Sequence, residues 1–140
     1  MKRLFRRTVV LFLACLCVFS FSSCKNGIKG DEAKAYINDF FAAIVDEDYD
    51  KAKSLIHPSI NIDLEAYLLR VEQEEGIDFQ AGIEIKRYTG FYNALYDSEV
   101  DGSAYELTMI ATVGDRTVEI EVEIVKNDQG YGIYDLEIDA

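Results

Sequence analysis

His57 is the only histidine of the 140-residue chain and the first residue to consider for proton transfer, because imidazole titrates near neutral pH. A general base also needs a nucleophile or an orienting group within hydrogen-bond distance, and the sequence places neither beside it. His57 directly precedes Pro58, and the residue before a proline is pushed out of the helical region. We therefore interpret His57 as a helix-end residue and assign no catalytic residue.

A short acidic cluster resembles the start of a calcium-binding loop. Asp46, Asp48 and Asp50 have the spacing of its first three ligands. The sixth position, however, is Lys51 instead of glycine, and the twelfth is His57 instead of glutamate, and the loop requires both. The cluster is therefore interpreted as a solvated helix junction. The sequence indicates no cofactor and leaves metal binding undecided.

Aromatic residues are the best candidates for contact with a ligand. Aromatic side chains on half-buried strands usually pack against neighbours, but they also line apolar pockets that contain a few polar groups. A cavity enzyme would in addition need a buried carboxylate with a shifted pKa, and the expected core faces of the last three strands hold none. We therefore expect binding without catalysis, with a candidate ligand pocket lined by Tyr88, Phe91, Tyr92 and Tyr96.

Three amphipathic helices are expected to come first. The first begins near Asp31, which can cap it, and carries an apolar stripe at helical spacing. The second follows the acidic residues 46–48 and ends before Pro58. The third runs from about Asn61 and stops at Gly76.

Alternation of apolar and polar residues replaces the helical period after Gly82 and predicts strands. The first strand is long and has Gly90 as its natural bulge point. The expected strands span residues 83–97, 105–113, 116–126 and 131–139.

Two turns fix the expected register of these strands. Gly114–Asp115 suits a two-residue hairpin with glycine first and pairs Val113 with Arg116. A three-residue loop over 128–130, with Gly130 in the left-handed region, places Ile124 opposite Tyr134, Val122 opposite Leu136 and Ile120 opposite Ile138. Both turns put the apolar residues on one face of the sheet, and this face must pack against another layer, for which the helices are the candidates. The sequence therefore predicts a two-layer α+β domain, with N-terminal helices packed on a curved antiparallel β-meander.

This order of elements resembles the nuclear transport factor 2-like superfamily, which has the cystatin-like superfold. The resemblance rests on the Tyr36/Phe40/Phe41 stripe, the short helix ending in Ile56–His57–Pro58 and the meander that follows. More narrowly, the chain is similar to lipoprotein domains of that class. The resemblance implies a cone-like sheet around a cavity. It also implies one of the functions found in that superfamily, whose members include isomerases, dehydratases and non-catalytic binding or assembly modules.

The other face of the expected sheet is acidic. The predicted register places Glu106 opposite Glu123 and Glu123 opposite Asp135, and such like-charge pairs cost about 0.2–1 kcal/mol each. One account is a solvent-facing surface on which water and salt screen the repulsion. The alternative is an acidic wall that binds divalent cations or a basic envelope protein. The acidic face consists of Glu106, Glu119, Glu121, Glu123, Asp135, Glu137 and Asp139.

The N-terminal residues have the anatomy of a secretory signal peptide: a basic head, an apolar run over 9–21 and small residues before Cys24. Such a run is shorter than the ~20 residues that a membrane-spanning helix needs. The sequence 21–24 resembles the bacterial lipobox, with phenylalanine where leucine is preferred, so Cys24 is expected to be acylated. We expect a signal peptide over 1–23, a lipidated cysteine with a short tether over 24–30, and one domain over 31–140.

Charge narrows the range of partners. The formal net charge is −12, and it becomes −16 once residues 1–23, with four basic and no acidic residues, are removed. Nucleic-acid binding is disfavoured, because a basic footprint is absent. The expected protein is a lipid-anchored lipoprotein on the extracytoplasmic side of the cell membrane. Its domain binds a small ligand or a basic envelope protein. The alternatives are a cavity enzyme of the isomerase or dehydratase type and an assembly module, and the oligomeric state stays open.

Overall fold

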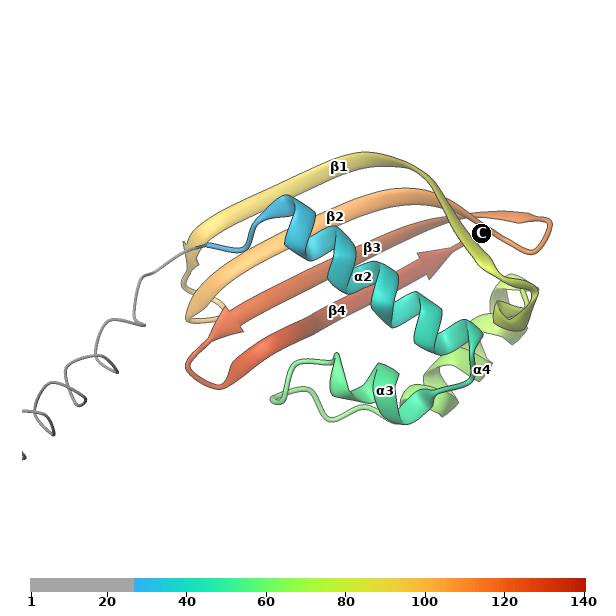
Figure 1. Cartoon of the computed structure of the whole chain (residues 1–140), viewed down its shortest axis with the longest axis horizontal. Coiled ribbons are helices and arrows are strands. Elements are labelled where there is room, and N and C mark those ends of the chain that lie inside the picture. The colour runs from blue at the N-terminus through green and yellow to red at the C-terminus, as the bar shows by residue number, and fades with distance from the viewer. Residues whose placement is uncertain (1–26) are drawn as a thin grey trace, which may run out of the picture.

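The computed structural model describes residues 27–140, in which three α-helices are followed by a four-stranded antiparallel sheet (Figure 1). The expected α+β fold, with helices packed on a β-meander, is confirmed. The helices are α2 (Gly30–Val45), α3 (Tyr49–Ser54) and α4 (Leu64–Glu75), followed by the 3-10 turn η2 (Phe79–Ala81). The strands are β1 (Ile83–Asp97), β2 (Gly102–Val113), β3 (Arg116–Asn127) and β4 (Gly130–Asp139).

Side-chain caps start two of the helices. The carboxylate of Asp48 accepts a hydrogen bond from the Lys51 amide at 3.1 Å and starts α3, directly after the acidic residues 46–48. Asp63 caps α4 in the same way, so α4 starts three residues later than expected. Gly76 ends α4 with φ = 64°, as predicted. The expected cap by Asp31 is wrong, because α2 already begins at Gly30.

The sheet has the order β1-β2-β3-β4, and the predicted register between β2 and β3 is confirmed along its whole length. Val113 pairs with Arg116, and Met109 pairs with Ile120. The hairpin depends on Gly114, whose φ of 59° is the conformation that favours glycine. The alternation read from the sequence therefore places every second residue of both strands in the core.

The predicted loop between β3 and β4 is wrong. Asn127 pairs with Gly130, so the loop has two residues, and Ile124 pairs with Ile133 instead of Tyr134. The side-chain oxygen of Asn127 accepts hydrogen bonds from the amides of residues 129 and 130, which closes the shorter loop. A bulge next to Glu123 then absorbs one residue of β4, so the expected pair Val122–Leu136 is still formed.

β1 is irregular, and its register against β2 shifts three times. One shift lies between Tyr88 and Gly90, at the bulge point that the sequence predicts. The others lie between Ile85 and Arg87 and near the end of the strand. Each bulge bends the strand and increases its twist. Figure 1 shows the resulting curvature of the sheet over α2.

The core lies between α2 and the face of the sheet that α2 crosses (Figure 1). Ile37, Phe40 and Ile44 of α2 are completely or almost completely buried, as are Met109 and Ile120 of the sheet. The first core residue is Ile28, so part of the expected tether is already packed. The signal peptide and Cys24 lie outside the described residues. No helix in the described range is long and apolar enough to cross a membrane.

Candidate functional site

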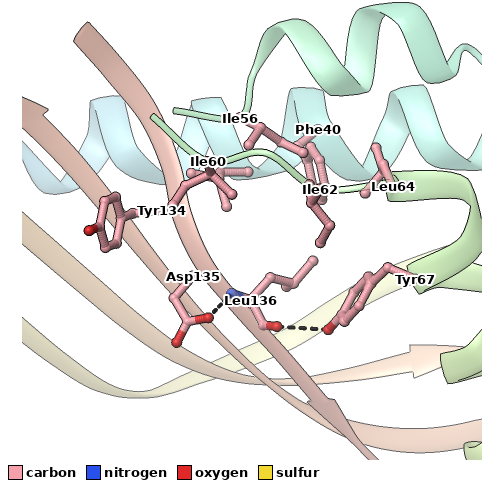
Figure 2. A pocket seen from close by; sticks show the side chains of 10 residues that line it. Phe40, Ile56, Ile60, Ile62, Leu64, Tyr67, Tyr134, Asp135 and Leu136 are labelled. Carbon is pink, nitrogen blue, oxygen red and sulfur yellow. Dashed lines mark hydrogen bonds between the residues drawn. The ribbon is translucent and has the colours of Figure 1, made fainter. Parts of the chain in front are cut away.

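An apolar pocket of about 150 Å³ lies between the segment after α3, helix α4 and strand β4 (Figure 2). Figure 2 shows isoleucine side chains and Leu136 around this space, with Tyr67 at one side. A cavity of this size with an apolar lining can hold a benzene-sized group. The lining residues are Phe40, Ile56, Ile60, Ile62, Leu64, Tyr67, Ile133, Tyr134, Asp135 and Leu136.

The two polar side chains at the pocket, Tyr67 and Asp135, are hydrogen-bonded to the backbone of Leu136. The Tyr67 hydroxyl donates to the carbonyl of Leu136 at 2.7 Å, and a carboxylate oxygen of Asp135 accepts from the Leu136 amide at 3.0 Å (Figure 2). Burial raises the pKa of Tyr67; Arg70 lowers it, and nearby carboxylates including Asp135 raise it further. The Tyr67 hydroxyl therefore stays protonated at neutral pH and protects this part of the β4 edge.

A second, more open pocket of about 300 Å³ lies where the end of α2 meets the start of β1. Its polar side chains are Asn38 and Asp46, on and just after α2. None of the four aromatic residues proposed from the sequence lines either pocket.

The structure places those four aromatic residues along β1. Tyr88 is half-buried, with the Lys34 ammonium 4.6 Å from the centre of its ring, and burial raises its pKa. Phe91, Tyr92 and Tyr96 have exposed fractions of 75%, 51% and 65%. A ligand pocket around these four residues stays a prediction.

His57 is completely buried at the end of the α3 segment. Its Nδ1 accepts hydrogen bonds from the Ser59 amide at 3.2 Å and from the Ser59 hydroxyl at 2.7 Å. Its Nε2 therefore carries the proton and donates to Asn127 Oδ1 at 3.1 Å. Asn127 also donates to the carbonyl of Val100. His57 and Asn127 together thus link the segment after α3, the end of β3 and the turn between β1 and β2. His57 lies outside the lining of both pockets.

The backbone around His57 leaves no room for a side chain at position 132 of β4. The His57 amide donates to the Ile133 carbonyl at 2.8 Å, and the Ile133 amide donates to the Leu55 carbonyl at 2.9 Å. A Cβ atom at Gly132 would lie 2.5 Å from the His57 nitrogen. Position 132 requires glycine because the backbones of β4 and of the segment around His57 approach so closely.

The predicted acidic face forms with the expected pairs. Glu123 lies opposite Glu106 on β2 and opposite Asp135 on β4. Burial raises the pKa of Glu123, and the negative charges of Glu106 and Asp135 raise it further. Burial is also the largest cause of the raised pKa of Glu121, followed by Glu106 and other nearby acids.

The acidic face has no positive partner among the described residues, whose two ion pairs are Lys53–Glu65 and Lys86–Glu84. Within residues 27–140, no three His, Cys, Asp or Glu side chains come together as a set of metal ligands. The face is therefore a broad region of negative charge.

Sequence reasoning missed the pocket and the role of His57. Ile56, Ile60 and Ile62 follow a short helix in a segment without helical or strand periodicity, and such apolar residues outside regular elements were the available signal. The contact of this segment with β4 joins residues that are more than 70 positions apart. No local pattern reports a pairing of that kind.

Comparisons with protein-family models, curated proteins and solved structures find no match for this chain. The resemblance to the nuclear transport factor 2-like superfamily therefore stays a prediction.

Proposed function

We propose that this chain is a lipoprotein tethered to the membrane through Cys24, on the extracytoplasmic side, and that its domain binds a partner without catalysing a reaction. The fold supports this arrangement, because the core is built from residues 28–138. Loss of residues 1–23 would remove none of the described core residues. The lipid would supply the attachment that no described helix can supply.

The observation that carries the binding role is the position of Asp135. This residue belongs to the acidic face and also borders the apolar pocket. A partner with an apolar side chain for the pocket and basic residues beside it would satisfy both surfaces. The pocket is about half the volume of the smallest sites that usually take drug-sized ligands. It therefore suits one side chain of a protein segment better than a whole metabolite.

The competing hypothesis is a cavity enzyme, and it has one observation in its favour. Asp135 and Tyr67 supply a carboxylate and a hydroxyl to the same pocket. Both groups, however, are bonded to the main chain of Leu136. These bonds compete with any proton transfer to a bound molecule, so binding is the better supported role.

Peptide titrations of a chain that begins at Lys25, followed by NMR, test the binding role. The test peptide has one phenylalanine between two pairs of lysines, and the control peptide has alanine in its place. Burial of the phenylalanine should tighten binding by roughly tenfold or more. Ile62→Glu, at a pocket residue 39% exposed, should remove this difference.

Leu69→Glu is the matched control, because Leu69 is 55% exposed and lies on α4 outside the pocket lining. It should leave the preference for the phenylalanine peptide unchanged. Equal affinity of the original chain for both peptides would contradict the proposal. Flotation of the full-length protein with membranes, and its loss in Cys24→Ser, tests the lipid anchor separately.

A further inference from the structure

The second half of β1 carries most of the large exposed apolar side chains of the described residues. Of the six large hydrophobic residues that are exposed in the described range, four lie within residues 91–96. We call Phe91, Tyr92, Leu95 and Tyr96 the β1 aromatic patch. β1 is an edge strand, so no described strand pairs with its outer side. Phe91 lies opposite Leu107 on the core face of the sheet, and Tyr92 lies opposite Glu106 on the acidic face, so the patch surrounds the free edge of β1. Exposed apolar side chains grouped at one edge are typical of a surface that contacts a partner or a membrane.

The patch is held by well-packed neighbours. The Phe91 ring stacks on the ring of Tyr105, with centres 6.5 Å apart and planes 15° from parallel. Tyr105 itself belongs to the core. The Tyr96 hydroxyl donates to an oxygen of Asp101 at 2.8 Å. The patch is therefore a fixed feature of the sheet.

The patch lies where the chain leaves the domain toward Cys24. A Cβ atom at Gly27 would lie 2.5 Å from Leu95 Cδ2, so the backbone of Gly27 runs against Leu95. Two residues, Lys25 and Asn26, separate Cys24 from Gly27, so three Cα–Cα steps join them. Even fully extended, they span at most about 11 Å. An acyl chain on Cys24 would therefore hold Gly27, and Leu95 beside it, near the bilayer surface.

We propose that the β1 aromatic patch lies in the membrane–water interface and orients the domain on the bilayer. This inference rests on the acylation of Cys24 proposed above. Tyrosine suits the interface because its ring is apolar and its hydroxyl is polar. Phe91 and Leu95, with exposed fractions of 75% and 71%, gain most from leaving water. The partner is thus a lipid surface.

The charges beside the patch limit its depth. Asp97 is the last residue of β1, and Glu99 and Asp101 lie in the turn between β1 and β2, directly after the patch. Carboxylates are costly to place in hydrocarbon, so the patch reaches only the headgroup region and the first part of the acyl chains. Negative lipid headgroups repel this turn, so we expect contact to be stronger on zwitterionic than on anionic bilayers.

Tryptophan fluorescence can report this contact, because the chain contains no tryptophan. Phe91→Trp places one indole in the patch, and Leu69→Trp places one on α4, at the other end of the sheet (Figure 1). Both full-length, lipidated proteins are reconstituted in phosphatidylcholine vesicles with brominated acyl chains. In Phe91→Trp we expect a blue-shifted emission and a loss of intensity, larger for bromines near the headgroup than near the chain end. In Leu69→Trp we expect neither.

Each other outcome overturns the inference in a distinct way. If the protein floats with the vesicles but the indole of Phe91→Trp is quenched no more than that of Leu69→Trp, the patch faces water and only this inference fails. If the full-length protein does not float, the lipid anchor fails as well. A blue shift that grows with protein density in unbrominated vesicles, without quenching by bromine, would assign the patch to a second copy of the chain.

Discussion

Replacing Glu123 by glutamine should stabilise the domain. Glu123 is the middle of three acids in a row across the sheet, between Glu106 on β2 and Asp135 on β4. Each opposed pair costs about 0.2–1 kcal/mol. Two pairs would give at most about 2 kcal/mol, and partial exposure with screening brings the expected gain to about 0.5–1 kcal/mol. For a domain of this size, that is a rise in Tm of roughly 2–6 °C.

The stability gained by Glu123→Gln should be larger at neutral pH than at acidic pH. The pKa of Glu123 is raised in the folded state by burial and by the neighbouring acids, from a usual value of 4.5. The folded state therefore holds its proton more tightly than the unfolded state does. The destabilisation is fully present above the raised pKa and disappears as the pH falls below about 4.5. Glu123→Gln should thus exceed the original chain in stability at pH 7 and lose its advantage near pH 4.

Urea unfolding followed by circular dichroism measures the effect. Glu74→Gln on α4 is the control, because Glu74 is exposed and lies outside the acidic face. The advantage of Glu123→Gln should also shrink in 1 M salt, where the screening length falls to about 3 Å. An unchanged or lower stability of Glu123→Gln at pH 7 in low salt would refute the reasoning.

Three further substitutions test the packing that forms the pocket and the loops. His57→Ala should lower the free energy of unfolding by about 2–4 kcal/mol, because it leaves a cavity and removes a partner of Asn127; urea unfolding with a loss below 1 kcal/mol would contradict this role. Gly132→Ala should cost about 1–3 kcal/mol in the same assay, since its Cβ meets the backbone of residues 56–57; a neutral effect would show that this contact is loose. Tyr67→Phe should cost about 0.5–1.5 kcal/mol by removing the bond to the Leu136 carbonyl, and it should speed hydrogen exchange along β4; unchanged exchange would mean that the hydroxyl does not protect the edge.

The sequence determined the features that depend on neighbouring residues. Alternation and the glycine-first turn at 114–115 were enough to align β2 with β3, because a slip by one residue would expose every core side chain. The same argument predicted the row of acids on the opposite face. The caps of α3 and the stop at Gly76 were also local, because a side chain or a glycine acts within one turn of the helix.

Tertiary structure decided the features that depend on distant contacts. The loop after β3 closes on two residues through Asn127, and the bulge in β4 then restores the pairing that the sequence predicts. The burial of His57 follows from its bonds to a residue 70 positions away. The pocket exists because the segment around Ile56 pairs with Ile133 and is thereby held beside α4 and β4. Exposure of the aromatic residues of β1 follows from the edge position of that strand. Periodicity describes one element at a time, whereas these features depend on which elements meet.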